Sequence, residues 1–189
     1  MKKIKSMLIE NIRENAEITA KLAELSEEIE KAAALFRTAL KKGKKIIVFG
    51  NGGSAADAQH FTAELVCRFE KNRRAVNALS LATNTSNLTA IANDFGYEYS
   101  FSRQLEAVGA KGDAALAIST SGNSPNVLKA ASSARKLGIK VAALSGAAGG
   151  KLKKLADINI IVPSRRIARI QESHSLILHT ICEALESDL

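Results

Sequence analysis

A short apolar run followed at once by a glycine-rich turn stands out at residues 46–64. The run is apolar at every position, as in a strand covered on both faces of a parallel sheet. Gly50, Gly52 and Gly53 allow the backbone to turn sharply and to approach a ligand closely. The alanine-rich stretch that follows predicts a helix capped by Ser54, and free N–H groups at a helix start favour an anion or a polar sugar group. A ligand site is therefore expected beside the first strand.

The chain repeats this alternation of strand and helix as far as its end. Such alternation predicts an α/β fold with a doubly wound, mostly parallel five-stranded sheet and helices on both faces. The expected strands are 45–49, 76–80, 114–118, 139–144 and 158–162. The expected helices are 54–69, 86–109 with a break near Gly96, 125–137, 149–155 and 166–187.

Residues 3–42 precede the first strand and read as two helices, the second starting at Ser26 and ending at Gly43. A helical pair in this place must pack on the flank of the sheet or on another subunit. We expect a single domain over residues 1–189, with 1–43 as packing and oligomerisation helices and 44–189 as the ligand-binding core.

Composition excludes several classes of protein. No apolar stretch reaches the roughly 18 residues of a membrane span, and the start lacks the apolar core of a signal peptide, so we expect a cytoplasmic protein without membrane contact. The net charge of +8 fits nucleic acid or phosphorylated substrates. Aromatic residues make up only 4%, too few for a base-stacking platform, and no nucleic-acid partner is expected. Cys67 and Cys182 lack metal-type spacing and are expected to be buried free thiols.

A second polar loop, at residues 119–124, follows the expected strand 114–118. It contains four hydroxyl side chains around Gly122, and Ser124 with Pro125 predicts the start of a helix. Hydroxyls and free N–H groups at a helix start form a phosphate cradle; a serine-rich turn that only caps a helix is the alternative. The chain has no G-K-[ST] motif, which disfavours a P-loop nucleotidase.

His60 and Glu64 lie four residues apart and share one face of the expected helix. A histidine alone is more often structural, but a carboxylate on its face beside a ligand-type turn favours an active site. An imidazole and a carboxylate suit proton transfer near neutral pH, and both are zinc ligands.

Four ordered segments of the chain resemble the phosphoheptose isomerase family of sugar isomerase (SIS) domains: 50–61, 90–96, 118–124 and 168–172. The resemblance covers essentially the whole chain, including the two leading helices. It implies a flavodoxin-like sheet order and an aldose–ketose isomerase that converts D-sedoheptulose 7-phosphate to D-glycero-D-manno-heptose 7-phosphate. That reaction is the first step of bacterial ADP- or GDP-heptose biosynthesis, which supplies heptose for lipopolysaccharide.

The resemblance also implies roles for individual residues. The implied substrate contacts are Asn51, Gly52, Gly53, Glu64, Asn93, Asp94, Ser119, Thr120, Ser121, Ser124 and Gln171. One zinc ion per subunit is implied, with the ligands His60, Glu64, Gln171 and His179. Glu64 and His179 are the implied acid/base pair, with Glu64 acting on the carbon-bound proton and His179 on the oxygens, or the reverse. Asn84 departs from the family, where an Asp is common, and this puts one substrate contact in doubt.

Gln171 and His179 are eight residues apart on one expected helix, about 12 Å along its axis at 1.5 Å per residue. Both can reach one metal ion more easily if they come from different subunits. We therefore expect an active site near a subunit interface, and the resembled family forms homotetramers.

Three other functions compete with this reading. Proteins similar to the DnaA initiator-associating family share the fold without catalysis, but a binding protein has no need of Glu64 and His179. Sugar-phosphate-binding regulatory SIS modules are usually joined to a DNA-binding domain, for which the sequence gives no sign. An isomerase of pentose or hexose phosphates remains open, because only the resemblance selects heptose.

Overall fold

The computed structural model describes residues 3–187, and these fold around one five-stranded sheet in which every strand is parallel to its neighbours. The strands are β1 Ile46–Gly50, β2 Ala78–Ser80, β3 Ala114–Ser119, β4 Lys140–Gly146 and β5 Ile158–Val162. The α-helices are α1 Ile4–Lys21, α2 Ser26–Lys41, α3 Gly53–Val66, α4 Thr85–Phe95, α5 Ser102–Val108, α6 Pro125–Lys136 and α7 Ile167–Glu186. Single 3₁₀ turns occur at η1 Leu22–Leu25, η2 Tyr97–Tyr99 and η3 Leu152–Lys154.

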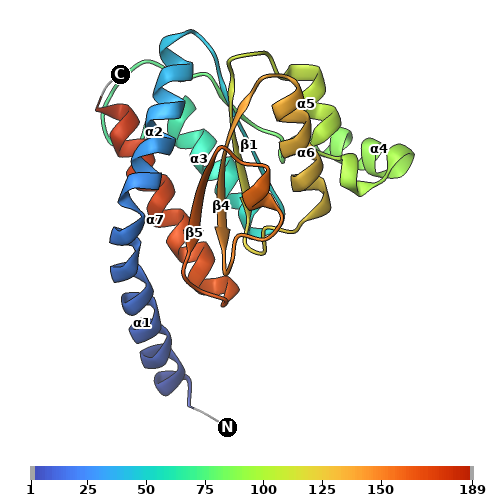
Figure 1. Cartoon of the computed structure of the whole chain (residues 1–189). Coiled ribbons are helices and arrows are strands. Elements are labelled where there is room, and N and C mark those ends of the chain that lie inside the picture. The colour runs from blue at the N-terminus through green and yellow to red at the C-terminus, as the bar shows by residue number, and fades with distance from the viewer. Residues whose placement is uncertain (1–2, 188–189) are drawn as a thin grey trace.

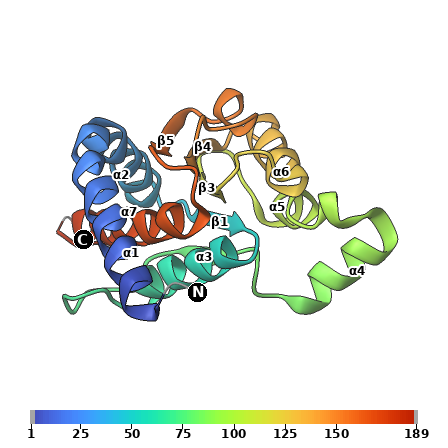
Figure 2. The same cartoon turned by 90° about the horizontal axis from the view of Figure 1, so that it is seen from below.

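Helices cover both faces of the sheet, as the apolar strands predict (Figures 1 and 2). Alternate residues of β1 point to opposite faces. Ile46 and Val48 join the core formed with α2, α3 and α7, and Ile47 and Phe49 join the core formed with α5 and α6. The predicted doubly wound fold is confirmed.

The strand order β2-β1-β3-β4-β5 is the flavodoxin-like order, and its switch point lies between β1 and β3. The two chain connections leave this point in opposite directions, which opens a crevice beyond the carboxyl ends of the strands. Gly50 at the end of β1 pairs in register with Ile118 near the end of β3. The glycine turn and the serine-rich loop therefore begin side by side at the switch point.

The long helix α1 extends away from the body of the molecule (Figure 1). Its outer half exposes a row of large apolar side chains, among them Ile4, Leu8 and Ile12. In contrast, α2 buries Phe36 completely against the sheet core. Of the two expected positions for the leading helices, α2 takes the flank of the sheet, and α1 packs along α7.

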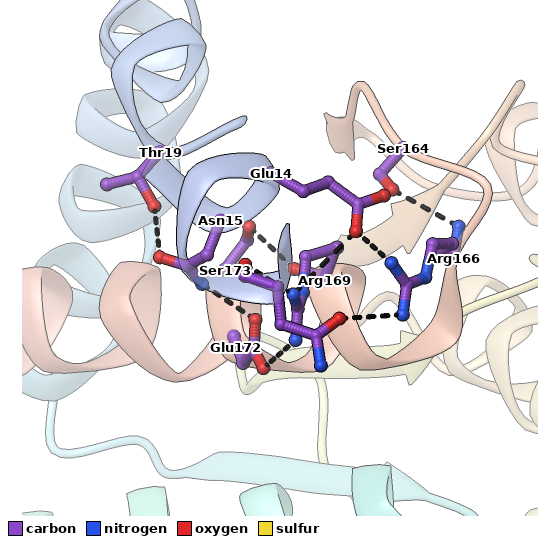
Figure 3. A network of polar contacts seen from close by, with 9 residues as sticks. Glu14, Asn15, Thr19, Ser164, Arg166, Arg169, Glu172 and Ser173 are labelled. Carbon is purple, nitrogen blue, oxygen red and sulfur yellow. Dashed lines mark hydrogen bonds and ion pairs between the residues drawn. The ribbon is translucent and has the colours of Figure 1, made fainter. Parts of the chain in front are cut away.

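A polar network fastens α1 to the start of α7 (Figure 3). Arg169 is only 6% exposed and donates to the backbone carbonyl of Asn11 at 2.6 Å and to Glu172. Asn15 donates to the other oxygen of Glu172 at 2.7 Å, and Arg166 pairs with Glu14. Arg169 thus serves the fold, joining the outer helix to the helix that carries Gln171 and His179.

Several local expectations were wrong. The expected helix 149–155 is only the turn η3, because Gly149 and Gly150 adopt positive φ angles of 79° and 55°. Cys182 is a buried free thiol as expected, but Cys67 is exposed just after α3. Burial raises the pKa of the Cys182 thiol to about 12, which keeps it protonated.

Among residues 3–187, no helix combines the length and apolar character needed to cross a membrane.

Candidate active site

The glycine turn after β1 places the start of α3 at the switch point. Gly52 is the residue before the helix and has φ 57°, a conformation that favours glycine. Ser54 does not cap α3, contrary to expectation; it lies buried inside the first turn of the helix. A methyl group on Gly53 would overlap the side-chain amide of Gln171, so the two residues are in close approach.

The serine-rich loop after β3 gathers its hydroxyls at the start of α6. Ser124 precedes α6 and Pro125 is its first residue, as expected, but the Ser124 hydroxyl makes no capping bond to the helix. Instead it lies 3.1 Å from the hydroxyl of Ser119, and Ser121 accepts the backbone N–H of Asn123. This loop unites hydroxyls with a helix N-terminus, which suits a phosphate group.

The two loops are joined by a network of side-chain hydrogen bonds that no pattern in the sequence predicts. Asn51 donates to Asn126 at 2.8 Å and accepts from it at 2.9 Å, and the hydroxyl of Tyr97 donates to Asn51 at 3.0 Å. Asn126 also donates to the hydroxyl of Ser100 and is 2% exposed. The side-chain amide of Asn51 therefore bridges the loops, which leaves its backbone for the expected contact with sugar.

Helices α3 and α7 lie side by side, in parallel and in register. Gln171 of α7 meets Gly53 at the start of α3. One turn on, Ser175 donates to Asp57 at 3.3 Å, and after one further turn the rings of His179 and His60 are in contact. Burial raises the pKa of the half-buried Asp57, while Ser175 and His60 oppose the rise.

This register gathers three of the predicted site residues toward the carboxyl end of α3. His60 Nε2 lies 3.1 Å from Glu64 Oε1. The His179 ring meets the His60 ring edge-on, with centroids 5.0 Å apart, and its other neighbour is the ring of Phe69 at 5.4 Å. The Glu64 side chain is 23% exposed and that of His60 is 50% exposed, so a ligand can reach both.

Gln171 does not join this cluster within the same subunit. It lies beside Gly53 at the opposite end of α3, eight positions before His179 on α7, which is about 12 Å along the helix axis. The spacing expected from the sequence is therefore retained in the fold. Gln171 belongs to the switch-point half of the site, and His60, Glu64 and His179 belong to the other half.

Asn93 and Asp94 lie exposed on α4, a helix that has no buried residue and stands apart from the body (Figure 2). Asn93 donates to the carboxylate of Asp94 at 2.8 Å. Asn84 precedes α4 and accepts the backbone N–H of Asn87 at 3.0 Å, which makes it the cap of that helix. An asparagine oxygen performs this capping as well as an aspartate oxygen does.

His174, three residues after Gln171, is fully buried. Its Nε2 lies 3.2 Å from the carbonyl oxygen of Ser145, so that nitrogen carries a proton. Burial lowers the pKa of His174 to about 4, although the Ser145 carbonyl favours the charged form. His174 is thus a neutral core residue, held by β4.

Known proteins of similar sequence and structure support this architecture. The SIS domain family matches residues 10–146. The chain is 49% identical to the phosphoheptose isomerase of Aliarcobacter butzleri over 187 residues, 98% of this chain and 99% of the relative. The chain belongs to the phosphoheptose isomerase family. It is also 53% identical to the phosphoheptose isomerase of Citrifermentans bemidjiense, with 91% of this chain and 90% of the relative covered.

A solved structure of a phosphoheptose isomerase, from Neisseria gonorrhoeae, superposes with a TM-score of 0.94 at 39% identity, covering 98% of this chain and 100% of that one. Membership of the phosphoheptose isomerase family makes the chain an isomerase of sugar phosphates. The relatives support the enzyme and give no support to the initiator-associating alternative.

The donor types of the cluster of His60, Glu64 and His179 fit a zinc ion. Two ligands of one tetrahedral zinc ion with bonds of about 2.0 Å lie about 3.3 Å apart, close to the 3.1 Å between His60 Nε2 and Glu64 Oε1. Nevertheless, within residues 3–187 no three His, Cys, Asp or Glu side chains are already arranged around one metal position. To serve as a third ligand, His179 would have to turn from its edge-on contact with His60.

Proposed function

We propose that the chain isomerises D-sedoheptulose 7-phosphate to D-glycero-D-manno-heptose 7-phosphate, the first step in making bacterial heptose. The observation that carries the proposal is the grouping of His60, Glu64 and His179 on two helices in register. Family membership at about half identity over nearly the whole chain supports the choice of a heptose phosphate.

The switch-point loops would hold the phosphate end of the substrate. Ser119, Thr120, Ser121 and Ser124 surround the start of α6, whose N–H groups favour an anion. The backbone at Asn51, Gly52 and Gly53 would contact the sugar hydroxyls, together with the amide of Gln171. This half of the site would bind and orient the substrate through hydroxyl, amide and backbone groups.

Glu64 and His179 would move the protons. Aldose–ketose isomerisation transfers a proton between C1 and C2, and it needs one group for the carbon-bound proton and another for the two oxygens. We assign Glu64 to the carbon-bound proton and His179 to the oxygens. A zinc ion held by His60, Glu64, His179 and Gln171 would supply polarisation of the carbonyl group when bound.

The length of the substrate supports a site shared between subunits. Gly53 and Glu64 are eleven residues apart on α3, about 16 Å. From C1 to the phosphorus atom the substrate has eight bonds of about 1.5 Å each, an extent of at most about 12 Å. A substrate held by the loops of one subunit would therefore meet Glu64 and His179 of another, which also brings Gln171 of the first subunit to the metal ligands of the second.

Exposed elements support the proposed homotetramer. α1 presents Ile4, Leu8 and Ile12 to its surroundings, and α4 presents Phe95. Contact between copies would cover these apolar side chains and would bring Asn93 and Asp94 of α4 toward a neighbouring site. Sedimentation velocity of the purified protein tests the assembly, and a fully active monomer would contradict it.

The decisive experiment is an assay of the purified protein with D-sedoheptulose 7-phosphate, before and after chelation and again after addition of zinc. We expect conversion to the aldose, loss on chelation and recovery with zinc. Conversion that withstands complete chelation would remove the metal from the proposal and leave the isomerase. The absence of conversion under all three conditions would refute the isomerase itself.

A further inference from the structure

Glu186, the last residue of α7, is a buried carboxylate that the proposed chemistry does not use. It is 6% exposed, and its two oxygens accept three successive backbone N–H groups, from Phe69 at 3.1 Å, Glu70 at 2.8 Å and Lys71 at 2.7 Å. Desolvation raises the pKa of Glu186, but these N–H donors and the Arg73 guanidinium outweigh it and hold the pKa below its usual range. An ionised Glu186 thus fastens the segment after α3 to the end of α7.

Arg73 continues this anchorage to the end of α3. Its side chain is 6% exposed, and its two terminal nitrogens donate to the carbonyl oxygens of Leu65 at 2.7 Å and Glu64 at 2.6 Å. Its Nε lies 3.3 Å from Glu186 Oε1, a charge contact without hydrogen-bond alignment. A cation is favourable at a helix C-terminus, and here it holds the backbone of Glu64 itself.

Phe69 carries the same anchorage to His179. The backbone N–H of Phe69 is bound by Glu186, and its ring lies against the His179 ring with centroids 5.4 Å apart and planes at 30°. His179 therefore contacts both Phe69 and His60. One carboxylate thereby fixes both the ring beside His179 and the cation that holds Glu64.

We propose that Glu186 and Arg73 are positioning residues that set the distance and angle between the Glu64 carboxylate and the His179 ring. The inference rests on the proposed function, because it takes Glu64 and His179 as the acid/base pair. Both positioning residues are buried, and neither is one of the proposed substrate contacts. Each acts through backbone or ring contacts of the last turn of α3 and the segment that follows it.

The chain offers a matched control in the Asp113–Lys45 pair. Asp113 is 2% exposed, accepts the backbone N–H groups of Lys45 and Ala110, and pairs with the Lys45 ammonium at 2.6 Å. Asp113 and Lys45 precede β3 and β1, at the amino ends of these two strands. The pair has the same construction as the Glu186 anchorage, but its hydrogen bonds reach neither the last turn of α3 nor the segment that carries Phe69.

The test compares the variants Glu186→Gln, Arg73→Lys and Asp113→Asn. Each variant is assayed in the same oligomeric state as the wild type. Displacing a reacting group by about 1 Å can cost about 100-fold in rate. For Glu186→Gln we expect kcat per folded enzyme to fall by about 10- to 100-fold while KM stays within about twofold. Arg73→Lys keeps the charge but cannot span both carbonyls, so we expect an intermediate fall. Asp113→Asn should lower the melting temperature and leave kcat unchanged.

A second measurement does not depend on activity. The chain has three histidines, so selective ¹³C labelling gives three imidazole signals, assigned by His60→Gln, His174→Gln and His179→Gln. In Glu186→Gln we expect the His179 signal to shift, because the Phe69 ring moves relative to the His179 ring. The His174 signal should stay unchanged. Asp113→Asn should move neither signal.

The two readouts separate the failure of the positioning role from the failure of the isomerase. A wild-type kcat together with an unshifted His179 signal in Glu186→Gln would overturn the positioning role. If the wild type fails to turn over sedoheptulose 7-phosphate, the proposed function is refuted. The histidine spectra then still test whether Glu186 holds Phe69 against His179. A shifted His179 signal then supports the anchorage, and an unshifted one refutes it.

Discussion

The side-chain amides of Asn51 and Asn126 hydrogen-bond to each other in both directions, with N···O distances of 2.8 and 2.9 Å. Asn51 belongs to the glycine turn after β1, and Asn126 lies in the first turn of α6 after the serine-rich loop. The pair spans the switch point and fixes one loop against the other. The proposed sugar-binding and phosphate-binding parts of the site are therefore joined into one unit.

Asn126→Asp should disrupt this unit. The change replaces the amide donor to Asn51 and Ser100 with an oxygen and places a carboxylate beside the Asn51 carbonyl oxygen. Leaving buried polar atoms unpaired costs about 1–3 kcal/mol, so we expect urea unfolding to report a loss of that size, and KM to rise about tenfold or more. The control is Asn159→Asp, whose amide donates to the Lys153 carbonyl near β5. A KM equal to that of the control would refute the role of the pair.

Glu64→Gln should abolish turnover and preserve substrate binding. The amide keeps the shape of the side chain but cannot accept a proton, and general base catalysis contributes about 10²- to 10⁴-fold. Isothermal titration with sedoheptulose 7-phosphate should show an affinity near that of the wild type, while kcat falls by about that factor. Glu27→Gln, at an exposed ion pair with Lys31 on α2, is the control. Near-normal turnover in Glu64→Gln would remove Glu64 from the mechanism.

Gly53→Ala should lower activity without lowering stability. The added methyl group overlaps the Gln171 amide, and the flexible end of that side chain can move away at little cost. Alanine also favours a helix over glycine by about 1 kcal/mol, so we expect an unchanged or higher melting temperature and a fall in kcat/KM of about tenfold.

A double-mutant cycle with Gln171→Ala tests the cause of that fall. In the Gln171→Ala background the overlap is gone, and Gly53→Ala should have almost no further effect on kcat/KM. Effects that simply add would show that Gly53 acts on the substrate without Gln171.

His174 should make the protein less stable in mild acid. Its pKa is about 4 in the fold and about 6.5 when unfolded, so between these values the unfolded chain binds the extra proton. The contribution is fully present above pH 6.5 and is lost as the pH falls toward 4, by up to roughly 3 kcal/mol at about 1.4 kcal/mol per pH unit. Urea unfolding of the wild type and His174→Gln from pH 7.5 to 4.5 should show a steeper loss in the wild type. Parallel curves would contradict the prediction.

The fold could be read from the sequence because it depends on periodic apolar patterns. The apolar runs at 46–49 and 114–118 became central strands, and the break expected near Gly96 separates α4 from α5. The start of α3 was predicted less well. Ser54 carries a hydroxyl of the capping type, but the cap position is taken by Gly52, two residues before Ser54.

Polar contacts between distant segments could not be predicted. Asn51 and Asn126 are 75 residues apart, and Glu186 and Phe69 are 117 residues apart, with no periodicity that links them. An isolated carboxylate near a chain end looks like any exposed charge until the fold brings three N–H groups to it. The residues that bear the proposed chemistry carried a motif, whereas the residues that hold them in place did not.

Because α3 and α7 are parallel and in register, the site depends on the number of residues between its side chains as well as on their chemistry. Gly53 faces Gln171, Asp57 faces Ser175, and His60 faces His179. One residue inserted into α7 after Ser175 would preserve every one of these side chains, yet it would turn His179 by about 100° and advance it by about 1.5 Å. The spacing of eight positions between Gln171 and His179 is thus as necessary to the proposed site as the side chains themselves. An insertion or deletion within this part of α7 should be as harmful as the loss of one of these side chains.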